Sequence, residues 1–271
     1  MGIGWERENR THFDEIVAGY DRIRPEYPAA LLSDVFEYAQ ADVRKKALEI
    51  GAGTGKATKS FLAAGYDVTA VEIGANMAAF LQERFGECGN FSVINESFEE
   101  AALENGAYDL IYAATSFHWV EAEIGCPKAL RLLRDGGAFA LFRYNAVPAD
   151  GDALYEEIQA VYKMYYHKPY VKPVRMSKED YTTPAAIYKG FRFDGMEQYG
   201  FEDVTMKLYD AARTFTANEY IEILETFADH RALADGDRAA LYAGVKKAII
   251  KHGGQITMEY VFQLYMGKKR N

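Results

Sequence analysis

The chain contains few cysteines, with Cys88 and Cys126 the two among 271 residues. Two cysteines are too few for a disulfide framework, and nothing else in the sequence indicates an oxidising compartment. No apolar run reaches the roughly 18 residues that a membrane-spanning helix needs. The first ten residues are polar and charged, unlike a secretory signal. We therefore expect a cytoplasmic protein that has no membrane partner.

Metal ligands and an excess of positive charge are also missing. The five histidines are scattered, and no group of Cys and His has the spacing of a metal site, so no metal is expected. The net charge is −9, whereas proteins that bind nucleic acid usually carry a basic face. We therefore expect no nucleic-acid partner. Hydrophobic residues make up 49% of the chain, which is enough for one large core or two modest ones.

From residue 47 onward, short apolar segments alternate with helical patterns. Strands that are each followed by a crossover helix indicate a parallel sheet with helices on both faces. The predicted strands are Ala47–Ile50, Val68–Val71, Phe91–Ile94, Leu110–Ala113 and Ala138–Phe142. The predicted helices are Ala57–Ala64, Gly74–Phe85, Phe98–Leu103 and Cys126–Leu133. The fold class is therefore α/β.

Three regions are predicted along the chain. Residues 1–40 carry two amphipathic patterns on either side of a proline-containing turn, and we expect them to form an N-terminal helical lid. Residues 41–145 carry the strand–helix alternation and are expected to form the core. Residues 146–271 are expected to supply two helical insertions that form a substrate lid, at 146–195 and 213–252, and further strands of the sheet, at Val204–Leu208 and Gln255–Tyr265.

A glycine-rich turn joins the first predicted strand to its helix. Residues 47–55 read A-L-E-I-G-A-G-T-G, and glycines at such a turn let the backbone approach a ligand closely. The dinucleotide fingerprint G-x-G-x-x-G has glycine at its sixth position, where this chain has Lys56. The acid Glu49 lies two residues before the first glycine. This spacing favours a cationic ligand with an amino-acid tail over a pyrophosphate.

A second acid ends the next predicted strand. Glu72 lies 21 residues after Gly51, at a position where a carboxylate can accept hydrogen bonds from both hydroxyls of a ribose. The alternative is an acid that only caps the following helix. The glycine turn at the expected distance upstream favours the ribose interpretation.

These two segments and three later ones resemble the class I S-adenosylmethionine-dependent methyltransferases. The resemblance is closer to the branch that contains methyltransferase type 11, ubiquinone-biosynthesis and trans-aconitate enzymes. The later segments are residues 95–99, residues 108–119 with their F-H-W run, and residues 129–137. The resemblance extends over about residues 10–145. It implies S-adenosylmethionine as cofactor and a Rossmann-like, seven-stranded, mostly parallel sheet whose last strand is antiparallel.

The resemblance also implies which residues hold the cofactor. In its N-terminal signature, Tyr20 would lie near the sulfonium and Arg24 would pair with the methionine carboxylate, although an Arg-Pro turn beside a packed tyrosine is the alternative. Ser97 stands where the family often has an aspartate beside the adenine. The implied cofactor-binding residues are Tyr20, Arg24, Glu49, Gly51, Ala52, Gly53, Gly55, Glu72, Ile73, Met77, Ser97, Phe98 and Ala114.

The acceptor side is predicted beyond the fourth and fifth strands, because open α/β sheets bind ligands at the carboxyl ends of their strands. His118 is a candidate general base, and Tyr20 is a second catalytic candidate. His118, Trp119, Arg143 and Tyr144 are candidates for substrate contact. The alternatives are a His118 that packs against Trp119 without moving a proton, a Trp119 that anchors the core, and a solvated Arg143 at a strand end.

Together these features predict a methyltransferase that transfers a methyl group from S-adenosylmethionine to a small-molecule acceptor by in-line displacement. A monomer or a homodimer is expected. Two alternatives remain open at this point. One is a regulatory module of the same fold that binds the cofactor without catalysis. The other is an NAD-dependent oxidoreductase, which the glycine spacing disfavours.

Overall fold

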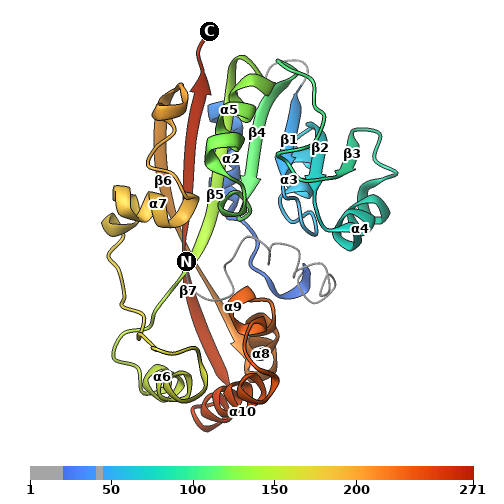
Figure 1. The fold of residues 1–271 in the computed structure, drawn as a ribbon. Helices are drawn as coiled ribbons and strands as arrows, with labels where there is room; N and C mark the ends of the chain where they lie inside the picture. Colours follow the sequence, from blue (N-terminus) through green and yellow to red (C-terminus); the bar gives the residue numbers. More distant parts are fainter. Residues whose placement is uncertain (1–20, 41–44) are drawn as a thin grey trace. The chain divides into compact units, whose positions relative to one another are not determined.

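The computed structural model describes residues 21–40 and 45–271. Its strands form one seven-stranded sheet of order β3-β2-β1-β4-β5-β7-β6 (Figure 1). The strands are β1 (Lys46–Ile50), β2 (Asp67–Glu72), β3 (Phe91–Asn95), β4 (Tyr108–Ala114), β5 (Leu133–Val147), β6 (Phe201–Thr216) and β7 (Gln255–Lys269). The pairs β1–β2, β1–β4, β2–β3 and β4–β5 are parallel. The predicted Rossmann-like α/β fold is confirmed.

The strand β7 runs against its neighbour β5. The side chain of Asn145, near the end of β5, donates to Gln263 Oε1 over 2.8 Å. The side chain of Lys269, at the end of β7, donates to the carbonyl oxygen of Leu133, at the start of β5, over 2.8 Å. Residue numbers therefore rise along one strand as they fall along the other. The sheet is mostly parallel and has an antiparallel final strand, as the resemblance implied.

One compact unit consists of residues 26–145, 177–209 and 261–271. Its helices are α2 (Ala29–Ala39), α3 (Thr58–Ala63), α4 (Ala75–Phe85), α5 (Ala122–Leu132) and α7 (Pro184–Phe191), with 3-10 turns at Phe117–Trp119, Glu179–Thr182 and Glu197–Tyr199. The central strand β4 is buried at its first six residues because helices cover both faces of the sheet. Leu48, Ile111 and Phe139 are fully buried in the core.

The predicted helix over Phe98–Leu103 is wrong. Residues 98–100 form a turn, and residues 101–104 have no regular secondary structure. Lys128 Nζ, on α5, donates to the carbonyl oxygens of Glu99 and Ala101 over 3.2 and 2.6 Å. These carbonyl groups are therefore satisfied by a lysine side chain that is distant in sequence, and not by the next helical turn.

The second compact unit comprises, among the described residues, 21–25, 146–176 and 210–260. Its helices are α6 (Ala153–Tyr165), α8 (Ala217–Glu225), α9 (Ala228–Arg231) and α10 (Asp235–Lys251). Asp152 caps α6, and Thr216 with Glu219 forms a capping box at α8. A Cβ at Gly244 of α10 would lie 2.6 Å from Val161 of α6, so glycine permits the close approach of these two helices. The helices fall inside the two predicted insertions, while their role as a lid stays a prediction.

Among residues 21–40 and 45–271, no helix is both long enough and apolar enough to cross a membrane. The same residues hold no cluster of three or more His, Cys, Asp or Glu side chains arranged to bind a metal ion.

Candidate active site

The glycine turn after β1 is closely packed on one side and open on the other. Gly51, Gly53 and Gly55 have φ values of +66°, +59° and +80°. A Cβ at Gly51 would lie 2.7 Å from the Cβ of Ser116, and a Cβ at Gly55 would lie 2.4 Å from Phe85 Cε2. A Cβ at Gly53 would meet no atom within 4 Å. The turn therefore packs against the protein at its two ends and leaves space for a ligand at its centre.

Glu72 ends β2 and links this turn to the next helix. Its Oε2 accepts a hydrogen bond from the backbone N–H of Gly53 over 2.7 Å, and its Oε1 accepts one from Gly74 over 2.9 Å. Gly74 is the N-cap residue of α4. Glu72 thus accepts a hydrogen bond at the start of α4, as the helix-capping alternative predicted, and it also accepts one from the glycine turn. A carboxylate oxygen can accept more than one hydrogen bond.

Glu49 is a buried acid beneath the turn, with 1% of its surface exposed. Its Oε2 accepts hydrogen bonds from Thr58 Oγ1 and the Tyr112 hydroxyl, over 2.5 and 2.9 Å. Its Oε1 is buried and accepts no hydrogen bond from the described residues. Burial raises the pKa of Glu49 to about 8, although the two hydrogen bonds oppose the shift, and the charge of Glu72 adds to it. An ammonium group placed here would compensate the buried carboxylate.

The predicted adenine side lies at the same edge of the sheet. Ser97 and Phe98 follow β3 and are 7% and 4% exposed. The side-chain amide of Asn95, the last residue of β3, donates to the carbonyl oxygens of Glu72 and Ile73 over 2.9 and 3.2 Å. The parallel order of these strands brings their carboxyl ends together. The remaining predicted cofactor residues of this unit are at the same ends or in the following helix: Ala52, Met77 and Ala114.

The N-terminal signature supplies two further predicted cofactor residues, Tyr20 and Arg24. Tyr20 lies outside the described residues. Arg24 belongs to the second compact unit, where its Nη2 donates to the carbonyl oxygen of Thr226 over 2.5 Å. Its guanidinium also stacks over the ring of Phe227, 4.7 Å from the centroid. The cofactor roles of Tyr20 and Arg24 stay predictions.

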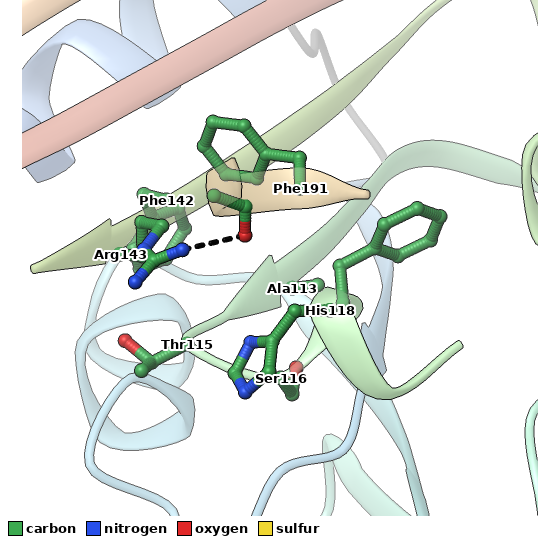
Figure 2. Close-up of a pocket in the computed structure, with 9 residues that line it drawn as sticks. Ala113, Thr115, Ser116, His118, Phe142, Arg143 and Phe191 are labelled. Carbon is green, nitrogen blue, oxygen red and sulfur yellow. Dashed lines mark hydrogen bonds between the residues drawn. The ribbon is translucent and has the colours of Figure 1, made fainter. Parts of the chain in front are cut away.

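A small pocket opens after β4, beside the glycine turn (Figure 2). Ser116 connects the two, because its hydroxyl donates to the carbonyl oxygen of Ile50 and its Cβ packs against Gly51. Thr115 has a φ of +59°, and its hydroxyl is 2.9 Å from that of Tyr27. The residues that line the pocket are Ala113, Thr115, Ser116, Phe117, His118, Phe142, Arg143, Gly190 and Phe191.

The F-H-W run forms a 3-10 turn whose three side chains differ in environment. Phe117 is the core anchor, since it is 2% exposed and packs edge to face on Phe139. His118 lines the pocket, and its ring centroid lies 5.1 Å from that of Trp119. Both residues are half-buried. His118 thus packs against Trp119 and also borders the pocket, which is compatible with either predicted role.

Arg143 borders the same pocket from β5, and Figure 2 draws its bond to Gly190. Its Nη1 donates to the carbonyl oxygen of Gly190 over 2.6 Å, and its Nη2 donates to Asn145 Oδ1 over 3.2 Å. Burial, reinforced by the charge of Arg192, lowers the pKa of Arg143 to about 10. Arg143 is of intermediate exposure and lies within β5, which extends to Val147, so its role in acceptor contact stays a prediction. Tyr144 packs on Phe262, with ring centroids 5.7 Å apart.

Sequence reasoning missed the part of the pocket that comes from residues beyond 145. Gly190 and Phe191 at the end of α7 line it, and Gln263 of β7 accepts a hydrogen bond from Asn145 over 2.8 Å. No local motif marks these positions. The contact of Tyr27 with Thr115 was also not predicted, although Tyr27 lies inside the N-terminal signature, because the roles implied for that signature concern Tyr20 and Arg24.

Comparisons with known proteins agree with this geometry. The family model described as a methyltransferase domain matches residues 48–141. An uncharacterised methyltransferase of Mycobacterium tuberculosis is 29% identical over 135 residues, which are 50% of this chain and 53% of that protein. The chain thus spans about half the length of the curated relatives of this group.

Solved structures share the fold at low sequence identity. A proposed type II methyltransferase from Anaeromyxobacter dehalogenans is 20% identical, with a TM-score of 0.60 over 91% of this chain and 97% of that one. Phosphoethanolamine N-methyltransferase 2 of Haemonchus contortus is 16% identical, with a TM-score of 0.55 over 100% of this chain and 61% of that one. Residues 48–141 therefore match a methyltransferase domain family, and the chain has the fold of the class I S-adenosylmethionine-dependent methyltransferases that its motifs resemble.

Proposed function

We propose that this chain transfers a methyl group from S-adenosylmethionine to a small-molecule acceptor. The family match and the fold support methyl transfer in general. The observation that carries the proposal is the direct packing of Ser116, which lines the pocket, on Gly51 of the cofactor turn. This contact puts a small pocket beside the loop that would hold the methyl donor.

The residues of the turn match the chemistry of S-adenosylmethionine. Glu72 would accept hydrogen bonds from the ribose, and Glu49, with its unpaired buried Oε1, would receive the amino group of the methionine tail. The open centre of the turn at Gly53 leaves room for the ligand. Around the adenine and ribose, the proposed contacts are Ile73, Met77, Ser97, Phe98 and Ala114. When bound, this cofactor supplies a methyl group that is already activated by its sulfonium.

The remaining work of the protein is to position the acceptor and exclude water. Holding two reactants in line contributes on the order of 7–11 kcal/mol in well-oriented intramolecular reactions. The aromatic side chains of Phe142 and Phe191 line the pocket and exclude water from an acceptor there. His118 is the pocket side chain that would accept a proton from an acceptor that enters protonated.

A small acceptor is supported by the fold neighbours. The Haemonchus contortus enzyme is described in complex with phosphomonomethylethanolamine and S-adenosylhomocysteine. Its identity of 16% does not carry that substrate over to this chain. The comparison supports the class of acceptor, a small molecule, and leaves its identity open.

Calorimetric titration of the full chain with S-adenosylmethionine, S-adenosylhomocysteine and NAD tests the proposal. We expect the first two to bind at about micromolar concentration and NAD not to bind, because a dinucleotide would need a sixth-position glycine. Binding of NAD alone would contradict the proposal. A screen of small acceptors for S-adenosylhomocysteine formation follows. Cofactor binding without turnover on any acceptor would favour the regulatory module.

A further inference from the structure

Arg143 is a partly buried arginine whose positive charge no described acid neutralises. Both of its hydrogen-bond partners among the described residues, Gly190 O and Asn145 Oδ1, are neutral carbonyl oxygens. Its Nε is buried and has no partner among the described residues. Burying a charge without a counter-charge is costly, and such groups in proteins are normally paired. The described residues therefore supply no anion to this guanidinium.

A second guanidinium increases this imbalance. Arg192 follows α7 directly and adopts a φ of +69°. Its charge is close enough to Arg143 to disfavour the protonated form of that residue. In the described part of the chain, the side chain of Arg192 makes no hydrogen bond or ion pair. Arg192 directly follows Phe191, which lines the pocket. Two like charges repel each other unless an anion lies between or beside them.

The guanidinium of Arg143 is held in place by a chain of hydrogen bonds. Asn145 accepts from Arg143 and donates to Gln263 over 2.8 Å, and Gln263 donates to the carbonyl oxygen of Tyr181 over 2.7 Å. Gln263 is 1% exposed, so this support is internal. Two of the five N–H donors of Arg143 are used by these neighbours and Gly190. A fixed guanidinium with unused donors is suited to bind an oxyanion.

We propose that the methyl acceptor carries an oxyanion, a carboxylate or a phosphate, that Arg143 binds while Arg192 adds attraction. The inference rests on the proposed function, since it concerns the acceptor of that same pocket. Binding of the anion at Arg143 would orient the acceptor beside Ser116 and His118, which share the pocket. Arg143 is then the residue that selects acidic acceptors over neutral ones.

A purely structural role for Arg143 makes a different prediction. Gly190 lies in the last turn of α7, where carbonyl oxygens have no helical partner and attract cations. If Arg143 only caps this helix, its replacement would change stability, and anions would bind no better than their neutral isosteres. Arg143→Gln removes the charge and keeps an amide donor, which ends two bonds short of the Nη atoms that bond Gly190. Arg143→Lys keeps the positive charge but loses the planar set of paired N–H donors of the guanidinium.

The experiment is a calorimetric titration of the full chain saturated with S-adenosylhomocysteine. The probes are benzoate, its neutral isostere benzamide, and inorganic phosphate. We expect benzoate or phosphate to bind and benzamide to bind about tenfold more weakly or not at all. Binding of benzoate without phosphate identifies a carboxylate acceptor, and the reverse identifies a phosphate. Equal binding of benzoate and benzamide, or binding of no anion, overturns the inference.

Three variants complete the test. Arg143→Gln should weaken anion binding by about tenfold or more, with Arg143→Lys intermediate. Arg131→Gln, an exposed arginine of α5 that bonds to Asn105, removes the same charge outside the pocket and should leave anion affinity unchanged. If Arg143→Gln does not fold, Arg192→Gln is the second variant. The side chain of Arg192 makes no hydrogen bond among the described residues, so its loss should not disturb the fold but should still weaken anion binding. Anion affinities that are the same in all variants overturn the inference.

The two proposals fail in distinguishable ways. The titration with S-adenosylhomocysteine comes first, and its failure contradicts the methyltransferase function itself. Binding of S-adenosylhomocysteine without any preference for anions leaves the function intact and removes only the assignment of Arg143.

Discussion

The backbone N–H of Gly53 donates to Oε2 of Glu72 over 2.7 Å, so the turn after β1 and the end of β2 are joined by a charge-assisted hydrogen bond. The other oxygen of Glu72 accepts from Gly74, at the start of α4. One carboxylate thus fixes both loops around the proposed ribose position. Its removal should affect cofactor affinity and local stability together.

We expect Glu72→Ala to lower the affinity for S-adenosylhomocysteine by about tenfold or more. The ribose would lose its hydrogen-bond acceptor, and the glycine turn would lose the hydrogen bond from Gly53 to Glu72. Two backbone N–H groups lose a partner, and each buried unsatisfied group costs about 1–3 kcal/mol. Calorimetric titration and chemical denaturation measure the two effects. Glu72→Gln, which keeps one acceptor oxygen, should recover part of both.

Asp67 provides the matched control, since it is an exposed acid at the opposite end of the same strand. Asp67→Ala should change neither affinity nor stability by more than about 0.5 kcal/mol. Equal affinity of Glu72→Ala and the unmodified chain would remove Glu72 from the cofactor site.

Alanine substitutions at Gly55 and Gly53 should distinguish a glycine needed for packing from one needed for ligand binding. Gly55→Ala places a Cβ 2.4 Å from Phe85 Cε2 at a φ of +80°, and overpacking of this kind costs about 1–3 kcal/mol. Gly53→Ala meets no atom within 4 Å, so only the strain of its positive φ remains, about 1–2 kcal/mol. Denaturation should therefore show the larger loss for Gly55→Ala.

Cofactor titration of the same two variants should give Gly53→Ala a clear loss of affinity despite its smaller effect on stability. Its Cβ would extend into the open centre of the turn, where the ligand is proposed to lie. Normal affinity in Gly53→Ala would place the ligand elsewhere.

The sequence predicted the first four strands and the glycine turn because these features are local. Buried parallel strands are continuous apolar runs, as in β4, and the turn requires glycine where Ser116 and Phe85 approach the backbone. The class I methyltransferase fold and the antiparallel last strand, which the family resemblance implied, are confirmed. The assignments of site residues to roles stay predictions.

The features that the sequence did not reveal depend on contacts between distant residues. Lys128 takes the carbonyl groups of Glu99 and Ala101, which prevents the expected helix over Phe98–Leu103. From the sequence alone, Arg143 was predicted to lie at a strand end. Its hydrogen bond to the carbonyl oxygen of Gly190 depends on the fold and not on the local sequence. No periodicity over a window of ten to twenty residues contains such information.

His118→Ala should lower turnover by about 100-fold or more if this histidine accepts a proton from the acceptor. The affinity for S-adenosylhomocysteine should stay the same, because the proposed cofactor contacts do not include His118. The measurement is kcat against pH, with an acceptor found in the screen. The acidic limb of the profile that reports the general base should disappear in the variant.

His252→Ala is the control for this experiment, since His252 pairs with Glu157 at 2.9 Å in the other compact unit. Unchanged turnover in His118→Ala at every pH would leave the packing against Trp119 as the role of His118.

Cofactor binding should release a proton from Glu49 near neutral pH. The pKa of Glu49 is raised to about 8 by burial, so the side chain is mostly protonated at pH 7. An ammonium group next to it would favour the carboxylate and expel the proton. Titration of S-adenosylhomocysteine in buffers with different ionisation enthalpies measures the number of protons released.

Two comparisons identify the source of that proton. Adenosine lacks the amino-acid tail and should bind without proton release, as should S-adenosylhomocysteine with Glu49→Gln. Because the folded pKa lies above the unfolded one, the protonated acid favours folding below pH 4.5, and this contribution is lost as pH rises towards 8. Proton release that persists in Glu49→Gln would assign the proton to another group.

His230 should make the protein sensitive to acid. It is 2% exposed, its Nε2 lies 3.2 Å from the Tyr162 hydroxyl, and its buried Nδ1 has no partner among the described residues. Burial lowers its pKa to about 4, against 6.5 in an unfolded chain, with Asp229 opposing and His167 adding to the shift. The unfolded chain therefore binds this proton first, and stability falls as pH decreases from about 6.5 to 4, by about 3 kcal/mol in total.

Denaturation of the full chain at several pH values measures this loss against a variant that cannot titrate. His230→Gln keeps a polar partner for Tyr162 and should flatten the dependence of the unfolding free energy between pH 4 and 6.5. His252→Gln removes a histidine from the surface of the same unit and should leave the slope from His230 intact. If His230→Gln loses stability with acid as steeply as the unmodified chain does, the buried imidazole is not the group that the proton enters.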